Sequence, residues 1–188
     1  FYASTTSLYK NIKNPSVKSK ITLDQIDYFE QAKLDAENLI KSKLKNYTIY
    51  RIPLVLSDSL YETFMYHGKR NDLMDVVTKE DCAYAFVKGI KYSDELNRKT
   101  FNVAGEIPVV YGNVLDRLLE YNGLSFKYVS ARLFLEKDYV SPVCSDRDEL
   151  ENIIHFRNDS LAQYYKRIKQ KRGNKRKINR LLAKVLVK

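Results

Sequence analysis

Apolar positions along the chain follow two kinds of spacing, and each kind predicts a type of secondary structure. Short runs rich in β-branched and aromatic residues indicate buried strands, whereas apolar residues three or four apart indicate amphipathic helices. The predicted strands are Phe1–Ser4, Tyr47–Leu56, Leu73–Val77, Thr100–Val103 and Phe126–Val129. The predicted helices are Asp27–Ser42 (with Asp24 as an alternative start), Glu80–Tyr92, Tyr111–Tyr121, Leu150–Phe156 and Leu161–Gln170. A polar connection, Thr5–Asp24, follows the first strand.

The first predicted helix carries one stripe with helical periodicity, which we expect to face the core. The stripe consists of Phe29, Ala32, Lys33, Ala36, Leu39 and Ile40. Residues four apart share a face of a helix, so Phe29 and Lys33 point together. The neighbouring Tyr28 is turned about 100° away from Phe29, and we expect it to have a buried packing role. Only a local bulge or a shifted helix would bring its hydroxyl to the position of Phe29.

Three later helices also show an apolar face that predicts burial. In Glu80–Tyr92 the expected buried residues are Cys82, Ala85, Phe86 and Ile90. In Tyr111–Tyr121, which Gly123 closes, they are Val114, Leu115, Leu118 and Leu119. In the last predicted helix they are Leu161, Tyr164, Tyr165 and Ile168.

Composition narrows the classes of protein. An apolar content of 44%, with 15 Tyr and 8 Phe, is ordinary for a globular core. Cys82 and Cys144 stand at no metal-ligand spacing, and we interpret them as structural thiols in a reducing cytosol. His67 and His155 are far apart, so no histidine-based metal site is expected. No run of 18 apolar residues occurs, and therefore no membrane-spanning helix is expected.

The positive charge is concentrated at the end of the chain. The formal net charge is +10, and 11 of the Lys and Arg residues lie from Lys166 onward, while no Asp or Glu follows Asp159. Subtracting these 11 charges from +10 leaves about −1 for the residues before Lys166. The body of the protein is therefore expected to be nearly neutral, with a basic tail.

The tail has an amphipathic helical pattern. Its apolar residues are Ile178, Leu181, Leu182, Val185 and Leu186, and its basic residues include Arg176, Lys177, Arg180, Lys184 and Lys188. A basic amphipathic helix over 174–188 can lie on an anionic membrane surface. It can equally dock its apolar face on its own protein or on a dimer partner. Nucleic-acid binding is disfavoured, because the tail has neither interleaved stacking aromatics nor a known nucleic-acid motif.

Several motifs, in their order and spacing, resemble the short-chain dehydrogenase/reductase superfamily, specifically its extended branch of sugar-nucleotide epimerases and dehydratases. The resemblance runs from Tyr2 to about Tyr165. Tyr2–Tyr9 looks like the family's strand and Ser/Thr loop, with Thr5 at the Ser/Thr position, and Asp27–Lys33 looks like its catalytic helix. The later matching segments are Tyr47–Pro53, Val77–Ala83 and Thr100–Gly105.

The resemblance implies roles for a few residues. Lys33 would hold the nicotinamide ribose of NAD or NADP, and Thr5 would bind a hydroxyl of a nucleoside-diphosphate sugar. The alternative role of Thr5 is capping or turn bonding. The backbone near Ile52 and Pro53 would bind the nicotinamide amide. A homodimer through the exposed side of the first helix is also implied, with Tyr28, Leu34 and Ile40 as candidates for that interface or the neighbouring core.

The positions that would carry chemistry depart from the family pattern. Phe29 occupies the place of the catalytic Tyr and cannot transfer a proton, although it belongs with Thr5 and Lys33 to the catalytic layout. Met74 stands where the family has a phosphate-binding Arg; Arg70, with Lys69, is the nearby candidate to replace it. Ser57 replaces a frequent Gly. In contrast, the scaffold-type residues are retained: Asp81, Asn102 and Gly105.

The glycine-rich turn that binds the dinucleotide pyrophosphate does not occur in the sequence, and its six glycines are scattered. The resemblance therefore predicts an α/β fold, the C-terminal part of a Rossmann-like doubly wound parallel sheet plus a small α/β substrate lobe. The expected division is 1–56 for the dinucleotide-binding part, 57–165 for the lobe and closing elements, and 166–188 for the tail. A complete small domain that lacks the cofactor half is the alternative.

Two functions follow from the resemblance. The first is a degenerate NAD(P)-dependent sugar-nucleotide epimerase/dehydratase-like protein, of which this chain is an incomplete and inactive portion. The second is a non-catalytic module that binds NAD(P) or a sugar nucleotide and acts as a regulator or scaffold. Either is expected to be cytoplasmic, with the tail allowing a peripheral membrane position.

Overall fold

The computed structural model describes residues 1–10, 12–22, 26–57, 69–123 and 141–186. Within the last helix, of residues 174–186 only Asn179 has a described side chain. The predicted strand Phe126–Val129, the histidine His67 and the side chains of the apolar tail stripe therefore lie outside the described part.

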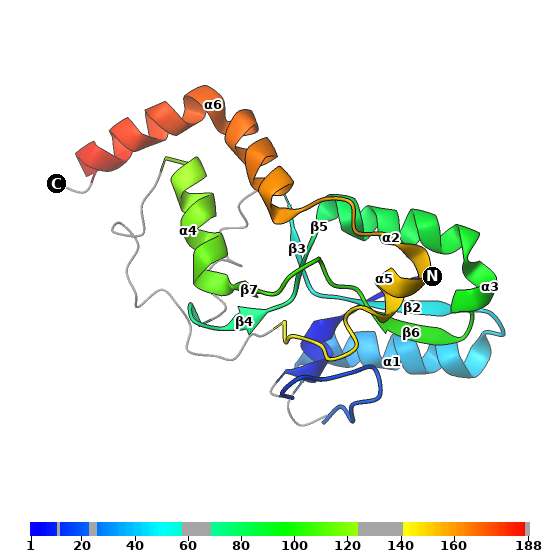
Figure 1. The fold of residues 1–188 in the computed structure, drawn as a ribbon. Helices are drawn as coiled ribbons and strands as arrows, with labels where there is room; N and C mark the ends of the chain where they lie inside the picture. Colours follow the sequence, from blue (N-terminus) through cyan, green and yellow to red (C-terminus); the bar gives the residue numbers. More distant parts are fainter. Residues whose placement is uncertain (11, 23–25, 58–68, 124–140, 187–188) are drawn as a thin grey trace.

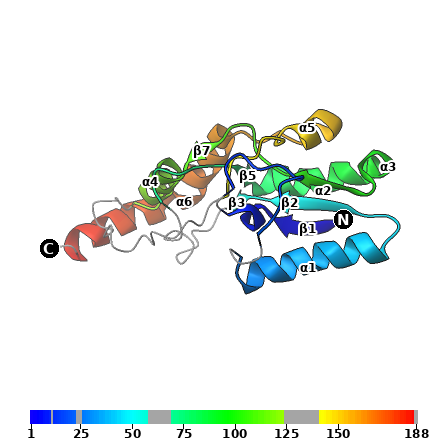
Figure 2. The ribbon, with the colours of Figure 1, turned by 90° about the horizontal axis from the view of Figure 1, so that it is seen from below.

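A parallel three-stranded sheet forms one half of the molecule (Figure 1). Its strands, in spatial order, are β1 (Tyr2–Thr5), β2 (Thr48–Ile52) and β6 (Lys99–Asn102). One helix, α1 (Tyr28–Lys43), covers one face, and α2 (Lys79–Lys91) covers the other, as Figures 1 and 2 show. Parallel strands require crossover connections, which these helices provide. The short helices η1 (Thr6–Tyr9) and α3 (Ser93–Leu96) follow β1 and α2.

A smaller lobe is built on two short strand pairs. Parallel β3 (Leu54–Leu56) and β5 (Val76–Thr78) form one pair, and antiparallel β4 (Leu73–Met74) and β7 (Val109–Val110) form the other. Pro53 separates β2 from β3, because proline has no N–H for a ladder. The remaining helices are α4 (Tyr111–Tyr121), α5 (Glu149–Ile154) and α6 (Leu161–Leu186).

The predicted stripe of α1 is wrong in three of its members, because Phe29, Ala32 and Leu39 are exposed, and the expected burial of Tyr28 is wrong as well. Phe29 is 55% exposed, Leu39 59% and Tyr28 96%. Two carboxylates are buried in their place, Glu30 and Glu37. Glu30 closes a capping box with Asp27, so the helix does begin where the sequence predicted. The helix packs its carboxylates inward because basic partners from other elements meet them there.

The other helices follow the sequence pattern more closely. In α4, Val114, Leu115 and Leu119 are buried, and in α6 Tyr164 and Ile168 pack against them. In α2, Ala85 is buried, but Ile90 is 65% exposed, contrary to the prediction. The position next to it, Gly89, faces the sheet instead, where a methyl group would lie 2.5 Å from the Tyr50 hydroxyl.

The last helix does not end where the sequence predicted. It continues from Leu161 to Leu186, with a non-helical residue at Gly173 that divides it into two parts. After this break Asn179 donates from Nδ2 to the carbonyl of Asn122, which follows α4. In the described part of the chain, no helix is both long and apolar enough to span a membrane.

Candidate functional site

Lys33 lies one helical turn after Phe29 on α1 and reaches over strand β1. Its Nζ donates to the carbonyl oxygen of Ala3 at 2.8 Å. Ala3 is two residues before Thr5, so the ammonium lies over the strand that ends at Thr5. The resemblance therefore places both residues on adjoining elements, and the structure does bring these elements together.

The Lys33 ammonium also lies over two aromatic rings. Its Nζ is 5.2 Å from the ring centroid of Tyr2 and 5.7 Å from that of Phe29. Both distances are within the range of cation–π interaction. Phe29 thus contributes the face of its ring to the ammonium but offers no hydroxyl, so this site has no proton donor at position 29.

Thr5 ends β1 and caps the short helix η1. Its Oγ1 accepts from the backbone N–H of Ser7 at 3.1 Å and lies 3.0 Å from the Ser7 hydroxyl. This is the capping role that the sequence left open for Thr5. The next residue, Thr6, is buried and bonds the Ser141 hydroxyl at 2.9 Å, so the turn after β1 is held from two sides.

Beneath these residues lies a buried ion pair that joins three elements. Arg51 of β2 donates Nε to Oε1 of Glu37 at 2.9 Å and Nη2 to Oε2 at 2.7 Å. Ser4 of β1 donates its hydroxyl to the same Oε1 at 2.6 Å. Burial alone would raise the pKa of Glu37, but the bonds from Arg51 and Ser4 outweigh it and hold that pKa below its usual value. The carboxylate is therefore ionised at neutral pH.

The pair continues into a chain of side-chain hydrogen bonds. Arg51 donates Nη1 to the Tyr9 hydroxyl at 2.9 Å, and Tyr9 donates to Oδ1 of Asn102 at 2.8 Å. Asn102 then donates Nδ2 to Asp146 at 2.7 Å. Burial raises the pKa of Tyr9 to about 12 although Arg51 opposes the shift, so Tyr9 stays protonated. Asn102, predicted as a scaffold residue, links β6 to this network.

The remaining predicted site residues lie on the lobe or at its border. Ile52 is half-buried and Pro53 buried at the end of β2. Arg70 pairs with Asp116 of α4 at 3.0 Å. Met74 is a buried core residue of the lobe, as expected of a side chain that cannot pair with a pyrophosphate. Ser57 accepts from the Tyr164 hydroxyl through its carbonyl at 2.7 Å.

Two predicted scaffold residues connect the halves of the molecule. Oδ1 of Asp81 accepts the backbone N–H groups of Asn158 and Asp159 at 2.8 and 2.9 Å, which fixes the turn before α6. Gly105 donates its N–H to Val76 at 2.7 Å, and a methyl group there would lie 2.7 Å from the same carbonyl oxygen. Glycine is therefore required at this close approach of two backbones.

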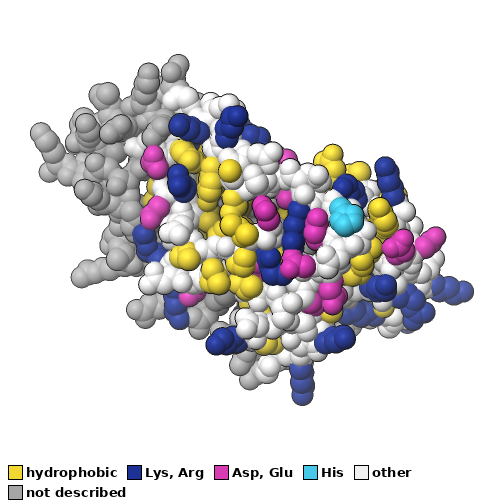
Figure 3. All heavy atoms as spheres, in the orientation of Figure 1, with side chains coloured by type: hydrophobic (Ala, Val, Ile, Leu, Met, Phe, Trp, Pro, Cys, Tyr) yellow, Lys and Arg dark blue, Asp and Glu magenta, His cyan; other side chains and the backbone are white. Residues whose placement is uncertain are grey.

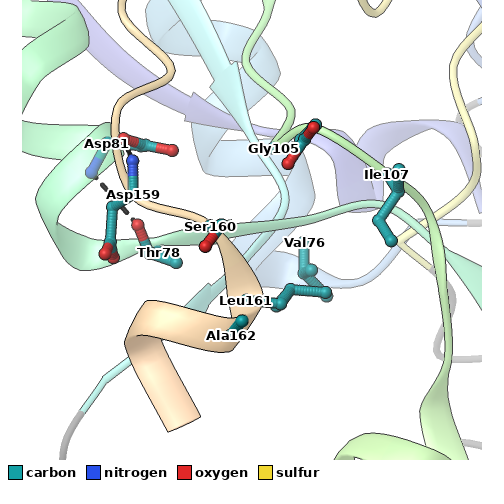
Figure 4. A pocket seen from close by; sticks show the side chains of 10 residues that line it. Val76, Thr78, Asp81, Gly105, Ile107, Asp159, Ser160, Leu161 and Ala162 are labelled. Atoms are coloured by element: carbon teal, nitrogen blue, oxygen red, sulfur yellow. Dashed lines mark hydrogen bonds between the residues drawn. The ribbon is translucent and has the colours of Figure 1, made fainter. Parts of the chain in front are cut away.

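A pocket of about 210 Å³ opens beside these two residues (Figure 4). Its walls are Val76, Thr78, Asp81, Gly105, Glu106, Ile107, Asp159, Ser160, Leu161 and Ala162. None of the predicted catalytic or cofactor residues lines it, so we do not assign it to the proposed chemistry. Among the described residues, no group of His, Cys, Asp and Glu side chains is arranged to hold a metal ion.

Sequence reasoning missed Glu37, Arg51 and Tyr9. A signal for the pair did exist: Glu37 lies one turn after Lys33 on the same helix face, and Arg51 interrupts an apolar strand. A lone charge within a buried strand needs a partner of opposite sign. The sequence does not say, however, which carboxylate supplies it.

Comparison with solved structures gives the fold. UDP-glucuronic acid 4-epimerase from Bacillus cereus, in complex with NAD, matches with a TM-score of 0.68 at 18% identity over 90% of this chain. A short-chain dehydrogenase/reductase protein from Agrobacterium tumefaciens with bound NAD matches all of this chain at a TM-score of 0.70 and 12% identity. The dTDP-glucose 4,6-dehydratase DesIV from Streptomyces venezuelae matches at 0.68 and 13% over 91% of this chain.

The α/β fold predicted from the sequence is thereby confirmed, and it is the fold of short-chain dehydrogenase/reductase proteins. The chain spans 61% of the Bacillus epimerase, 69% of the Agrobacterium protein and 58% of the dehydratase. No protein-family model and no curated protein sequence matches this chain. Because the identities are low, the comparison establishes the fold, and the activity has to be inferred from the residues.

Proposed function

We propose that this chain is part of an NAD(P)-dependent sugar-nucleotide epimerase/dehydratase-like protein whose acid–base step is impaired. The observation that carries the proposal is the placement of Lys33 over β1, the strand that ends at Thr5. In the proposed site Lys33 binds the nicotinamide ribose, Thr5 a hydroxyl of the sugar, and the backbone at Ile52 and Pro53 the nicotinamide amide. Arg70 is the proposed contact to the sugar nucleotide on the lobe side.

The fold and the solved neighbours support this assignment of ligands. The Bacillus epimerase has been solved with UDP-glucuronic acid and NAD, and RMD from Pseudomonas aeruginosa, which is also similar in structure to this chain, with NADPH. NAD or NADP and a nucleoside-diphosphate sugar are therefore the ligands to test. The stretches of fold that this chain does not span are where we expect the pyrophosphate to bind, since its sequence has no glycine-rich turn.

Phe29 is the reason for proposing impaired chemistry. Removal of a general acid–base group costs typically about 10²–10⁴-fold in rate. Binding need not suffer equally: a Tyr-to-Phe mutant of the Bacillus epimerase was solved with NAD and a fluorinated UDP sugar. Replacing that tyrosine by phenylalanine is thus compatible with binding both ligands in the epimerase, and we propose the same of Phe29, whose ring lies over the Lys33 ammonium.

The test compares the complete protein that carries this chain with its Phe29→Tyr variant. UDP-glucuronic acid and dTDP-glucose serve as substrates with NAD or NADP, and product formation is followed by chromatography. We expect turnover to rise by about 10²–10⁴-fold in Phe29→Tyr, and to be lost again when Lys33→Met is added. Equal rates in the two proteins would show that residue 29 does not stand at the reacting centre.

A non-catalytic binding or regulatory module is the second candidate, and the exposed, hydroxyl-free Phe29 favours it. It is distinguished by the same experiment: turnover with Phe29 in place supports an enzyme, whereas turnover only after Phe29→Tyr supports the module. For the 188-residue chain alone we expect no micromolar binding of NAD(H) or NADP(H) in calorimetry. Such binding would indicate a cofactor site different from the one proposed.

A further inference from the structure

Three side chains, Ser4, Glu37 and Arg51, form one buried cluster. Each lies on a helix or strand that also carries a residue of the proposed site. Ser4 precedes Thr5 on β1, Glu37 lies one turn after Lys33 on α1, and Arg51 precedes Ile52 on β2. Ser4, Glu37 and Arg51 are each at most 4% exposed. The cluster thus joins the three elements immediately beneath the residues proposed to bind the ligands.

The geometry of the cluster allows one arrangement of these elements. Ser4 and Arg51 are direct partners in the parallel register of β1 and β2, so their side chains leave the sheet on the same face. Glu37 lies over both and accepts from each, with Arg51 bonding through a two-pronged fork. A bidentate fork requires a planar match of both oxygens. A shift of α1 along the sheet, or a slip of β1 by one residue, breaks it.

Such a pair is better suited to fixing geometry than to adding stability. Buried ion pairs lose in desolvation much of what they gain in attraction, and well-packed apolar residues of similar volume often do as well or better. The Glu37 carboxylate receives four hydrogen bonds from three residues, the fourth coming from Lys41. Arg51 in turn donates to Tyr9, which reaches β6 through Asn102. Every one of these contacts is directional.

We infer that Glu37 and Arg51 are positioning residues, which hold α1 on β1 and β2 so that Lys33 stays over β1, the strand that ends at Thr5. The inference rests on the proposed function for its relevance to catalysis, but its geometry is a property of this chain. Neither residue is proposed to touch a ligand. They act through Lys33, whose contact with Ala3 reports on the placement of the helix.

The ammonium group of Lys33 provides a direct readout in this chain. A hydrogen-bonded lysine ammonium gives a resolved ¹⁵N signal when its protons exchange slowly, so the signal follows the Lys33–Ala3 contact. We expect proton exchange to be at least about tenfold faster in Glu37→Gln, because one partner of a buried pair is lost. Arg51→Lys is expected to behave in the same way although it keeps the charge, since lysine cannot form the fork.

Two further variants make the result decisive. Thr48→Val is the matched control: it removes a buried hydrogen bond to Leu96 at the opposite end of β2, and the Lys33 signal should not change. Ser4→Ala removes a single bond to Glu37 and should speed exchange by about fivefold, which decides the case if Glu37→Gln does not fold. An unchanged Lys33 signal in Ser4→Ala and Arg51→Lys would overturn the inference.

A second readout separates this inference from the proposed function. In the complete protein carrying Phe29→Tyr, adding Glu37→Gln should lower kcat while KM for the sugar nucleotide stays within about twofold. If Phe29→Tyr shows no turnover with any nucleotide sugar, the proposed function fails, and the ammonium signal still decides whether the pair positions Lys33. If kcat and KM change together, Glu37 affects ligand binding generally and the positioning role is wrong.

Discussion

At the scale of single residues, the least expected feature is a carboxylate with no exposure to water. Glu37 keeps its charge in the interior because Arg51, Ser4 and Lys41 supply donors to both of its oxygens. Charged hydrogen bonds of this kind are about twice as strong as neutral ones. Their number explains why the pKa of Glu37 lies below its usual value in spite of burial.

The surroundings of Glu37 predict that the free energy of unfolding depends on pH. The pKa of Glu37 is lower in the folded than in the unfolded chain, so its contribution is fully present above the unfolded value and is lost as pH falls through the folded one. At pH 7, Glu37→Gln should lower the free energy of unfolding by about 3–5 kcal/mol. In urea titrations near pH 3 the difference between the two proteins should shrink. A constant difference across this range would contradict the assignment.

Gly105 carries a second prediction at the residue scale. A methyl group there would meet the Val76 carbonyl oxygen at 2.7 Å, and both partners are backbone and cannot rotate away. Gly105→Ala should therefore lower the free energy of unfolding by about 1–3 kcal/mol, measured by urea titration. If Gly105→Ala left the free energy of unfolding unchanged, the backbones at Gly105 and Val76 would be able to move apart at little cost.

At the scale of elements, the two parts of helix α6 each contact α4. Its first part buries Tyr164 and Ile168 against α4, and the part after Gly173 contacts the end of α4 through Asn179. The contact of Asn179 agrees with docking on the protein itself. Binding to an anionic surface stays a prediction of the sequence pattern.

Truncation after Gly173 tests both roles of this helix. Because Tyr164 and Ile168, the buried residues of α6 among its described side chains, precede Gly173, we expect the truncated protein to fold, with circular dichroism and a melting curve like those of the whole chain. The whole chain should bind vesicles that contain anionic lipid and lose this binding with added salt, since each basic residue near the surface contributes about 1 kcal/mol. Loss of folding on truncation would instead assign the tail to the core.

At the scale of the whole molecule, the surface offers α1 as a candidate contact. Its outer side exposes Tyr28 and Leu39, each more than half exposed. Acidic and basic side chains are interspersed on the face seen in Figure 3, which gives no broad basic surface there. On the outer side of α1, which faces away in that view, the exposed Tyr28 and Leu39 make a protein partner the expectation.

We expect the complete protein to form a homodimer through α1. Leu39→Glu combined with Tyr28→Glu should place like charges in the interface and shift sedimentation at tens of micromolar towards the monomer. Val87→Glu on α2 is the control, because it adds a similar charge to an exposed residue on the opposite face of the sheet. A monomeric complete protein at this concentration would rule out the contact.

The elements could be predicted because their signals are local. The Asp27 cap and the apolar spacing of α4 depend only on neighbours in sequence, and their positions agree with the structure. The inward face of α1 could not be predicted, because Glu37 is buried only by virtue of Arg51, 14 residues away. The same holds for Tyr9 and Asn102, which are joined by the fold and not by spacing.

The hydrogen bond between Thr6 and Ser141 has a consequence for how the protein is made. Its two residues are separated by 135 positions. At a synthesis rate of about 5–20 residues per second, roughly 7 to 27 seconds pass between them on the ribosome. During that interval the turn after β1 has no partner for its buried hydroxyl. The turn after β1 therefore reaches this native contact only after the much later segment with Ser141 has been translated.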